Sequence, residues 1–183
     1  MPAPPGGTTR PTTDRVRESV FAQIVAWRGR ADEAAGEQLR GLRFLDLYAG
    51  SGAVGFEAVS RGATATWVER NRAVTRLIAS TQHTLGVAGR VVTAAVVPFL
   101  RTGTPEPYDV VWADPPYDVA TTEIDALLAA LAGRGWLTAD GLVVVERASR
   151  GEPPQFPEIL TDSWIRRYGD TSVYFAPRRV ITP

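Results

Sequence analysis

Short apolar runs alternate with segments of helical periodicity along most of this 183-residue chain. The apolar runs predict strands. The segments between them, with apolar residues three and four positions apart, predict helices. We expect strands at about 43–48, 64–69, 91–96, 108–113 and 142–147, and helices at about 52–61, 71–85 and 121–132. Asn71 and either Thr121 or Thr122 are the expected caps of the last two helices. Strands separated by helices indicate an open parallel sheet with helices on both faces.

A hairpin completes the expected sheet near the C-terminus. Two short apolar runs, 164–168 and 172–175, flank Gly169-Asp170, and this spacing predicts two antiparallel strands joined by a tight turn. Together with the five helix-linked strands, the hairpin gives a mostly parallel α/β sheet of seven strands.

The N-terminal segment differs in composition from the rest. Residues 1–13 are rich in proline and glycine, which predicts a flexible arm. A helix is expected to follow, ending at about Trp27 and capped by Thr12, Thr13 or Asp14. Residues 14–183 are then expected to form a single domain, which is long enough for one core.

The composition excludes several classes of protein. There is no cysteine, so no disulfide and no cysteine-based metal site is expected, and we predict no metal. The longest apolar run, 91–100, is too short to span a bilayer, and the start has no apolar signal region. We therefore expect a cytoplasmic protein. Twenty basic residues balance twenty acidic ones, so the net charge argues neither for nor against a nucleic-acid partner.

A glycine loop follows the first expected strand. Its glycines, Gly50, Gly52 and Gly55, let the backbone approach a ligand, and the helix that follows presents a partly positive N-terminus. The spacing also satisfies the dinucleotide fingerprint, and Glu69 lies about twenty residues on, where an acid could bind ribose. This loop leaves two hypotheses open: a dinucleotide-dependent oxidoreductase and a methyltransferase.

Asp46 helps to separate these hypotheses. It lies four residues before Gly50, and we expect it at the strand end, facing the space above the loop. A carboxylate there would repel the pyrophosphate of a dinucleotide. It would attract the ammonium and sulfonium of S-adenosylmethionine, which carries no phosphate. Asp46 therefore favours the methyl donor.

The strand at 108–113 stops on Asp114-Pro115-Pro116-Tyr117. The prolines prevent the strand from continuing and leave the Pro115 carbonyl without a ladder partner. A carboxylate beside a free carbonyl offers two acceptors that fit a planar NH2 group, and Tyr117 offers a flat face for stacking. The alternative is a strand-ending turn, because Asp-Pro-Pro is also good turn chemistry.

The candidate loops share one position in the expected sheet. The glycine loop, Glu69, residues 94–96 and the tetrad at 114–117 all follow the carboxyl ends of strands. In open α/β sheets, ligands bind outside these ends. The sequence therefore predicts that the four loops converge on one crevice.

The chain resembles the RsmD-type 16S rRNA guanine-N2 methyltransferases of bacteria over about residues 9–176. The matching stretches are 9–18 with Phe21, 46–52 with 61–63, 114–117 and 168–171. This resemblance implies a Rossmann-like class I methyltransferase fold. It also implies that S-adenosylmethionine is the methyl donor and S-adenosylhomocysteine the product.

The resemblance also implies roles for individual residues. The cofactor-binding residues would be Asp46, Tyr48, Ala49, Gly50, Ser51, Gly52, Glu69, Arg70, Ala95 and Val96, with the backbone of the last two beside the adenine. The catalytic group would be Asp114, Pro115, Pro116 and Tyr117. Arg10, Thr12, Arg15 and Arg17 would contact RNA. The partner would be 16S rRNA in an assembled or assembling small subunit, and we expect a monomer.

Two features depart from the family pattern. Only eight residues precede Thr9, where the family usually has a basic hairpin that would help to dock RNA. The loop after the third strand also lacks the Asp with which many related enzymes hold the adenine amino group.

Other substrates remain open at this point. Adenine-N6 or cytosine-N4 methylation of DNA would use the same two acceptors, but normally needs extra structure that reads a duplex groove. Methylation of a protein glutamine is also chemically possible, but it gives the arginines of the N-terminal segment no role.

Overall fold

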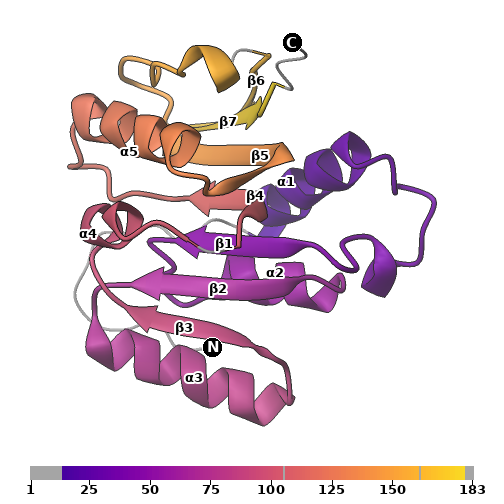
Figure 1. Cartoon of the computed structure of the whole chain (residues 1–183). Coiled ribbons are helices and arrows are strands. Elements are labelled where there is room, and N and C mark those ends of the chain that lie inside the picture. The colour runs from indigo at the N-terminus through magenta and orange to yellow at the C-terminus, as the bar shows by residue number, and fades with distance from the viewer. Residues whose placement is uncertain (1–13, 105, 161, 180–183) are drawn as a thin grey trace.

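The computed structural model describes residues 14–104, 106–160 and 162–179. Within them, seven strands form one sheet in the order β3-β2-β1-β4-β5-β7-β6, as Figure 1 shows. The strands are β1 (Arg43–Leu47), β2 (Thr64–Glu69), β3 (Gly89–Thr93), β4 (Tyr108–Ala113), β5 (Leu137–Ala148), β6 (Trp164–Tyr168) and β7 (Thr171–Pro177). Strands β1 to β5 pair in parallel, and β7 is antiparallel to both β5 and β6. The predicted mostly parallel sheet with a C-terminal hairpin is confirmed.

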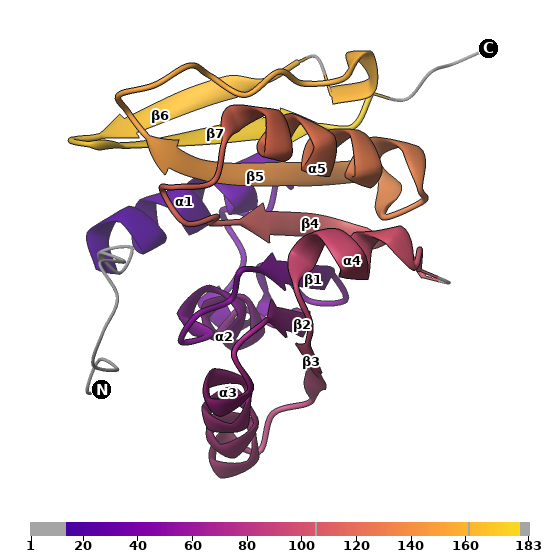
Figure 2. The same ribbon diagram turned by 90° about the vertical axis from the view of Figure 1, so that its left-hand side faces the viewer.

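Helices cover both faces of the sheet. The helices are α1 (Asp14–Trp27), α2 (Ala53–Ser60), α3 (Arg72–Leu85), α4 (Val96–Arg101) and α5 (Thr121–Gly133). Buried residues of α1, α2 and α3 share one core cluster, and those of α4 and α5 share another. Figure 2 shows α1, α2 and α3 on one side of the strands and α4 on the other. Successive side chains of a strand alternate between these layers, which explains why the central strands are mostly apolar on both faces.

The prediction for residues 91–96 is wrong in part. The third strand runs from Gly89 to Thr93, and Val96 begins the short helix α4. Val96, Phe99 and Leu100 are buried at helical spacing, so packing against the core decides for a helix here. Pro98 lies in the first turn of α4, where proline is tolerated because its missing N–H would have no helical partner.

Two further boundaries differ from the prediction. Strand β5 begins at Leu137, five residues before the expected start, because Asp140-Gly141 resembles a turn but lies within the strand. The cap of α5 is Ala120, which makes no side-chain cap bond, so neither Thr121 nor Thr122 caps this helix. The predicted cap of α3 is confirmed, since the Asn71 side chain accepts hydrogen bonds from the first turn.

At the N-terminus, Asp14 is already the first residue of α1. The expected arm at 1–13, and with it Thr12 and Thr13 as possible caps, lies outside the described residues. No helix in the described part of the chain is long and apolar enough to cross a membrane.

Candidate active site

Hydrogen bonds join the strand-end loops at the carboxyl edge of the sheet. The backbone N–H of Gly50 donates to Glu69 Oε2 at 3.2 Å, and the N–H of Ala94 donates to the Glu69 carbonyl at 3.1 Å. The N–H of Asp114 lies 3.5 Å from the Leu47 carbonyl. The structure thus brings together the loops that follow β1, β2, β3 and β4.

The glycine loop is a tight turn with unusual backbone angles. The N–H of Gly52 donates to the Ala49 carbonyl at 2.7 Å, which closes the turn around Gly50 and the exposed Ser51. Both glycines have positive φ. Tyr48 also has a φ of +58°, in the left-handed region that costs a non-glycine residue about 1–2 kcal/mol. Such strain is often found at ligand-binding sites.

Gly55 allows α2 to lie close to β2. A Cβ atom at Gly55 would meet Nε1 of the buried Trp67 at 2.1 Å. The same Nε1 donates to the Gly52 carbonyl at 3.1 Å, so the indole cannot easily move away. The third glycine of the loop motif therefore serves helix–strand packing, a role that does not depend on which cofactor binds.

Asp46 is buried beneath the loop, with 1% of its surface exposed. The prediction that it faces the space above the loop is therefore wrong. Its Oδ2 accepts the N–H of Gly55 at 2.9 Å, which ties β1 to the start of α2. Burial raises its pKa well above the usual value. The Gly55 hydrogen bond opposes this rise, and the carboxylates of Asp114 and Glu69 add to it.

Glu69 lies across the loop at the end of β2. Besides Gly50, it binds the N–H of Asn71 through Oε1 at 2.8 Å, and it stays partly exposed. Arg70, next to it, is exposed and close enough to lower the pKa of Tyr48. With Asp46 and Asp114, Glu69 completes a cluster of three carboxylates that suits a cationic ligand with hydroxyl groups better than a pyrophosphate.

The loop after β3 offers mainly its backbone. Ala95 is the exposed residue that precedes α4, and the Val96 side chain is buried in the core. Any contact of Val96 with a ligand must therefore come from its main chain.

The tetrad after β4 presents two adjacent acceptors. In the described part of the chain, no donor lies within hydrogen-bond distance of the Asp114 carboxylate or the Pro115 carbonyl. The Pro116 carbonyl instead accepts the N–H of Val119 at 3.0 Å and closes a turn. Tyr117 is 46% exposed, so its ring is available for stacking. The two free acceptors and the ring match the arrangement expected from the sequence.

Two charged residues next to Asp114, Glu146 and Arg147, were not among the predicted site residues. Ala113 pairs with Val145 of the neighbouring strand β5, so Asp114 and Glu146 follow side by side. Burial raises the pKa of Asp114 to about 8. Glu146 adds to this rise, and Arg147 opposes it. In the sequence these two residues are only charged positions near the end of a strand, and the pairing of β4 with β5 is what brings them next to Asp114.

The proposed RNA-contacting residues are only partly described. Arg10 and Thr12 lie outside the described residues. Arg15 is exposed in the first turn of α1. Arg17 donates to Asp14 at 2.8 Å and lies 3.9 Å from Glu57, so its charge is already paired within the protein.

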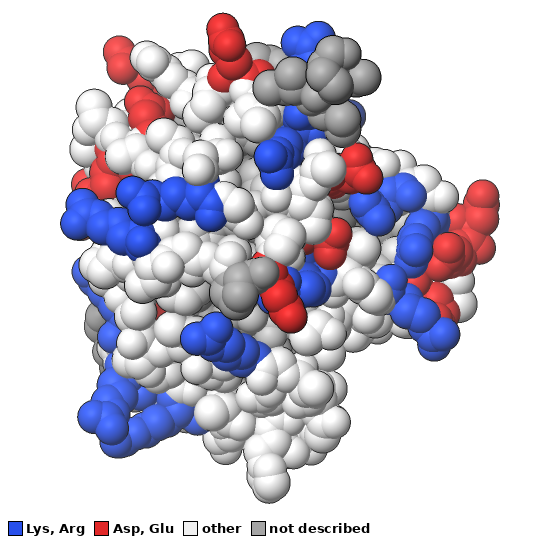
Figure 3. Space-filling model, in the orientation of Figure 1, with Lys and Arg blue, Asp and Glu red and all other residues white. Residues whose placement is uncertain are grey.

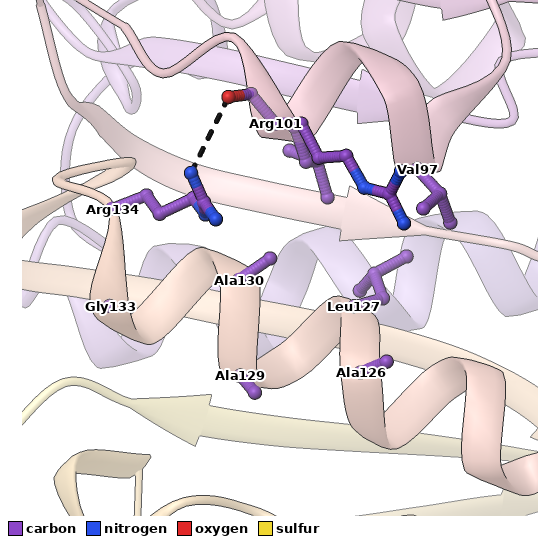
Figure 4. Close-up of a pocket in the computed structure, with 9 residues that line it drawn as sticks. Val97, Arg101, Ala126, Leu127, Ala129, Ala130, Gly133 and Arg134 are labelled. Atoms are coloured by element: carbon purple, nitrogen blue, oxygen red, sulfur yellow. Dashed lines mark hydrogen bonds between the residues drawn. The ribbon is translucent and has the colours of Figure 1, made fainter.

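Charged residues are distributed over the surface. On the face in Figure 3, basic side chains lie in separate patches, interrupted by uncharged and acidic ones. A groove of about 570 Å³ between α4 and α5 is flanked by Arg101 and Arg134, as Figure 4 shows. Its lining includes no residue of the four loops, so it is separate from the candidate site.

The family model described as Conserved hypothetical protein 95 matches residues 1–177 of this sequence. The chain belongs to this family. A relative, the ribosomal RNA small subunit methyltransferase D of Escherichia coli strain K12, is 35% identical over 160 residues. These residues make up 86% of this chain and 73% of the relative.

Comparison with solved structures leads to the same family and to its fold. A putative methyltransferase, yhhF from Escherichia coli, is 31% identical, with a TM-score of 0.79 over 98% of this chain and 92% of that one. The Thermus thermophilus 16S rRNA N2 G1207 methyltransferase (RsmC), in complex with AdoMet and guanosine, has a TM-score of 0.68. It is 18% identical over 96% of this chain and 45% of that one, so this likeness shows the fold alone. The predicted family and class I methyltransferase fold are confirmed, which decides against the dinucleotide-dependent oxidoreductase.

Proposed function

We propose that this family member transfers a methyl group from S-adenosylmethionine to the exocyclic N2 amine of a guanine in 16S rRNA of the small ribosomal subunit. The observation that carries this proposal is the pair of free acceptors, Asp114 and the Pro115 carbonyl, beside a cluster of carboxylates. The Escherichia coli relative that is 35% identical to this chain is named a ribosomal RNA small subunit methyltransferase.

The chemistry of the loop residues fits S-adenosylmethionine. This cofactor supplies a methyl group on a positively charged sulfur. Asp46, Glu69 and Asp114 surround the glycine loop with acidic groups, and their mutual repulsion contributes to the raised pKa of Asp46. A bound cation would relieve this repulsion. Glu69 would accept the ribose hydroxyls, and the backbone at Ala95 and Val96 would lie beside the adenine.

The tetrad would activate the target amine. Guanine N2 is a weak nucleophile because its lone pair is delocalised into the ring. Asp114 and the Pro115 carbonyl would each accept one N2 hydrogen, which draws the lone pair out of conjugation and directs it at the methyl carbon. A carboxylate also stabilises the positive charge that develops on nitrogen during transfer. Afterwards the surplus proton leaves through Asp114 or water.

Tyr117 would hold the target base. A guanine must leave its stack to reach the acceptors, which costs about a few kcal/mol, and less in unpaired RNA. Stacking on the exposed ring of Tyr117 would return about 1–3 kcal/mol.

The described part of the chain favours a substrate that already has a defined three-dimensional structure. Its residues form the catalytic sheet and the helices packed on it, and none of them builds a separate module that reads a DNA groove. The recognition elements available in the described chain are α1 and the edge around the site. An assembled or assembling subunit would supply the missing specificity through its own structure.

Methyl transfer with a labelled donor tests this proposal. Unmodified small subunits, incubated with the protein and tritiated S-adenosylmethionine, should acquire label in 16S rRNA, and digestion should yield N2-methylguanosine. The Asp114→Ala variant should be slower by about 10²–10³-fold while still binding S-adenosylmethionine. Label in protein or in another nucleoside, or normal turnover by the variant, would overturn the proposal.

A further inference from the structure

Asp114, itself partly buried, lies with two buried carboxylates near the ends of three strands. The parallel pairing of β4 and β5 places Asp114 beside Glu146, of which only 3% is exposed. Asp46 of β1 lies close enough for its charge and that of Asp114 to affect each other. Buried carboxylates this close repel one another strongly when both are ionised. A carboxyl in such a cluster either keeps its proton or is balanced by a nearby positive charge.

Arg147 supplies this charge from the end of β5. Its guanidinium lowers the pKa of Asp114, and it acts in the same direction on Tyr48. Of the groups that act on the charge of Asp114 from β1 and β5, Asp46 and Glu146 are acidic and Arg147 is basic.

The same guanidinium fastens the loop that carries the tetrad. Nη2 of Arg147 donates to the Val119 carbonyl at 2.9 Å. The Val119 N–H in turn donates to the Pro116 carbonyl at 3.0 Å. Arg147 thus connects β5 to the far end of the loop that begins at Asp114, and it fixes the turn from which Tyr117 projects.

Arg147 is poorly explained by the stability of the fold alone. Its second nitrogen, Nη1, is buried and has no hydrogen-bond partner among the described residues, and the same holds for the hydroxyl of Tyr48. An unpaired buried donor costs about 1–3 kcal/mol. A cost of this kind calls for an explanation other than packing, and a functional role is one such explanation.

We propose that Arg147 is a positioning residue of the methyl transfer, which holds the tetrad loop through the Val119 carbonyl and balances the Asp114–Glu146 pair so that Asp114 can accept the target amine. This role rests on the proposed function, since it assumes that Asp114 binds the amine. It adds a residue on β5 to a site otherwise built from the ends of β1 to β4.

Arg147→Met tests the role by removing the charge and the donors while keeping an apolar stem. Methyl transfer to small subunits should fall about 10–100-fold in kcat, as expected when a reacting group is held loosely. The pH at which kcat reaches half its maximum should rise by about one unit, because the cation beside Asp114 is gone. Arg147→Lys should restore the pH midpoint and part of kcat. Arg150→Met, at an exposed position three residues away, should change neither value.

A second measurement uses the free protein and needs no RNA. The Asp114 carboxyl carbon, assigned in NMR spectra with an Asp114→Asn variant, should titrate at higher pH in Arg147→Met than in the wild type or in Arg150→Met. An unchanged titration would overturn the role of Arg147 whatever the substrate is. A lower melting temperature with an unchanged pH midpoint of kcat would also overturn it, since that result describes a residue needed only for folding. Absence of methyl transfer by the wild type, with the titration shift present, would instead count against the proposed function.

Discussion

Replacing Asp114 with asparagine should stabilise the free protein while it impairs methyl transfer. Burial and Glu146 raise the pKa of Asp114 from 3.8 to about 8 in the folded state. The folded protein therefore holds this proton more tightly than the unfolded chain does. As the pH rises from about 4 to about 8, the free energy of unfolding should fall, because only the unfolded chain ionises Asp114 without cost. Asparagine cannot ionise, so Asp114→Asn escapes this loss.

The size of the effect follows from the pKa. At about 1.4 kcal/mol per pKa unit, the rise sets an upper bound of about 6 kcal/mol at pH 8. Asp114 is only partly buried, and solvent screens part of this energy, so we expect a gain of about 1–3 kcal/mol. For a chain of this size, such a gain raises the melting temperature by about 3–9 °C.

Melting temperatures of the free protein, measured between about pH 5 and pH 8, would show the effect. The difference between Asp114→Asn and the wild type should widen as the pH rises. Asp118→Asn serves as the matched control, since it removes an exposed carboxylate from the same loop. A difference that stays constant or narrows with rising pH, or a variant less stable than the wild type at pH 8, would refute the reasoning.

Three further predictions concern packing, base binding and RNA affinity. Gly55→Ala should lower the free energy of unfolding by about 1–3 kcal/mol in denaturant titrations, because its Cβ would meet a buried indole; Gly133→Ala, with open space around it, should be neutral or slightly stabilising. Tyr117→Ala should raise KM for small subunits about 5–150-fold without changing the Kd of S-adenosylmethionine, and Tyr117→Phe should restore KM; equal effects of both variants would count against stacking. Arg10→Ala with Arg15→Ala should make the dependence of RNA affinity on salt less steep, and an unchanged slope would remove both residues from the interface.

Much of the fold could be predicted from the sequence because, in most elements, the local hydrophobic pattern and the tertiary packing favour the same secondary structure. The strand that contains Asp46 and the strand before Asp114 are mostly apolar, and a glycine loop or a pair of prolines follows each of them. The third strand shows where such prediction fails. Residues 91–100 are apolar almost throughout, so periodicity alone could not separate a strand from the buried helix α4. Strand β5 contains Asp140-Gly141, and this turn chemistry coincides with an irregularity in the pairing with β4, where Tyr108 pairs with Leu137 and Val110 pairs with Leu142.

The candidate site was predictable to a similar extent. Strand-end position identified the glycine loop, Glu69 and the tetrad, since parallel strands present their carboxyl ends at one edge. The orientation of Asp46 was not predictable, because its burial depends on the hydrogen bond to Gly55 across the turn. The importance of Glu146 and Arg147 was also hidden, since it arises from the pairing of β4 with β5.

A crystal structure of the protein with S-adenosylhomocysteine and guanosine tests the central claim most directly. Guanosine N2 should lie within hydrogen-bond distance of both the Asp114 carboxylate and the Pro115 carbonyl, with the base stacked on Tyr117 and N2 facing the sulfur atom. A base bound elsewhere, or an Asp114 carboxylate turned away from the amine, would contradict the account.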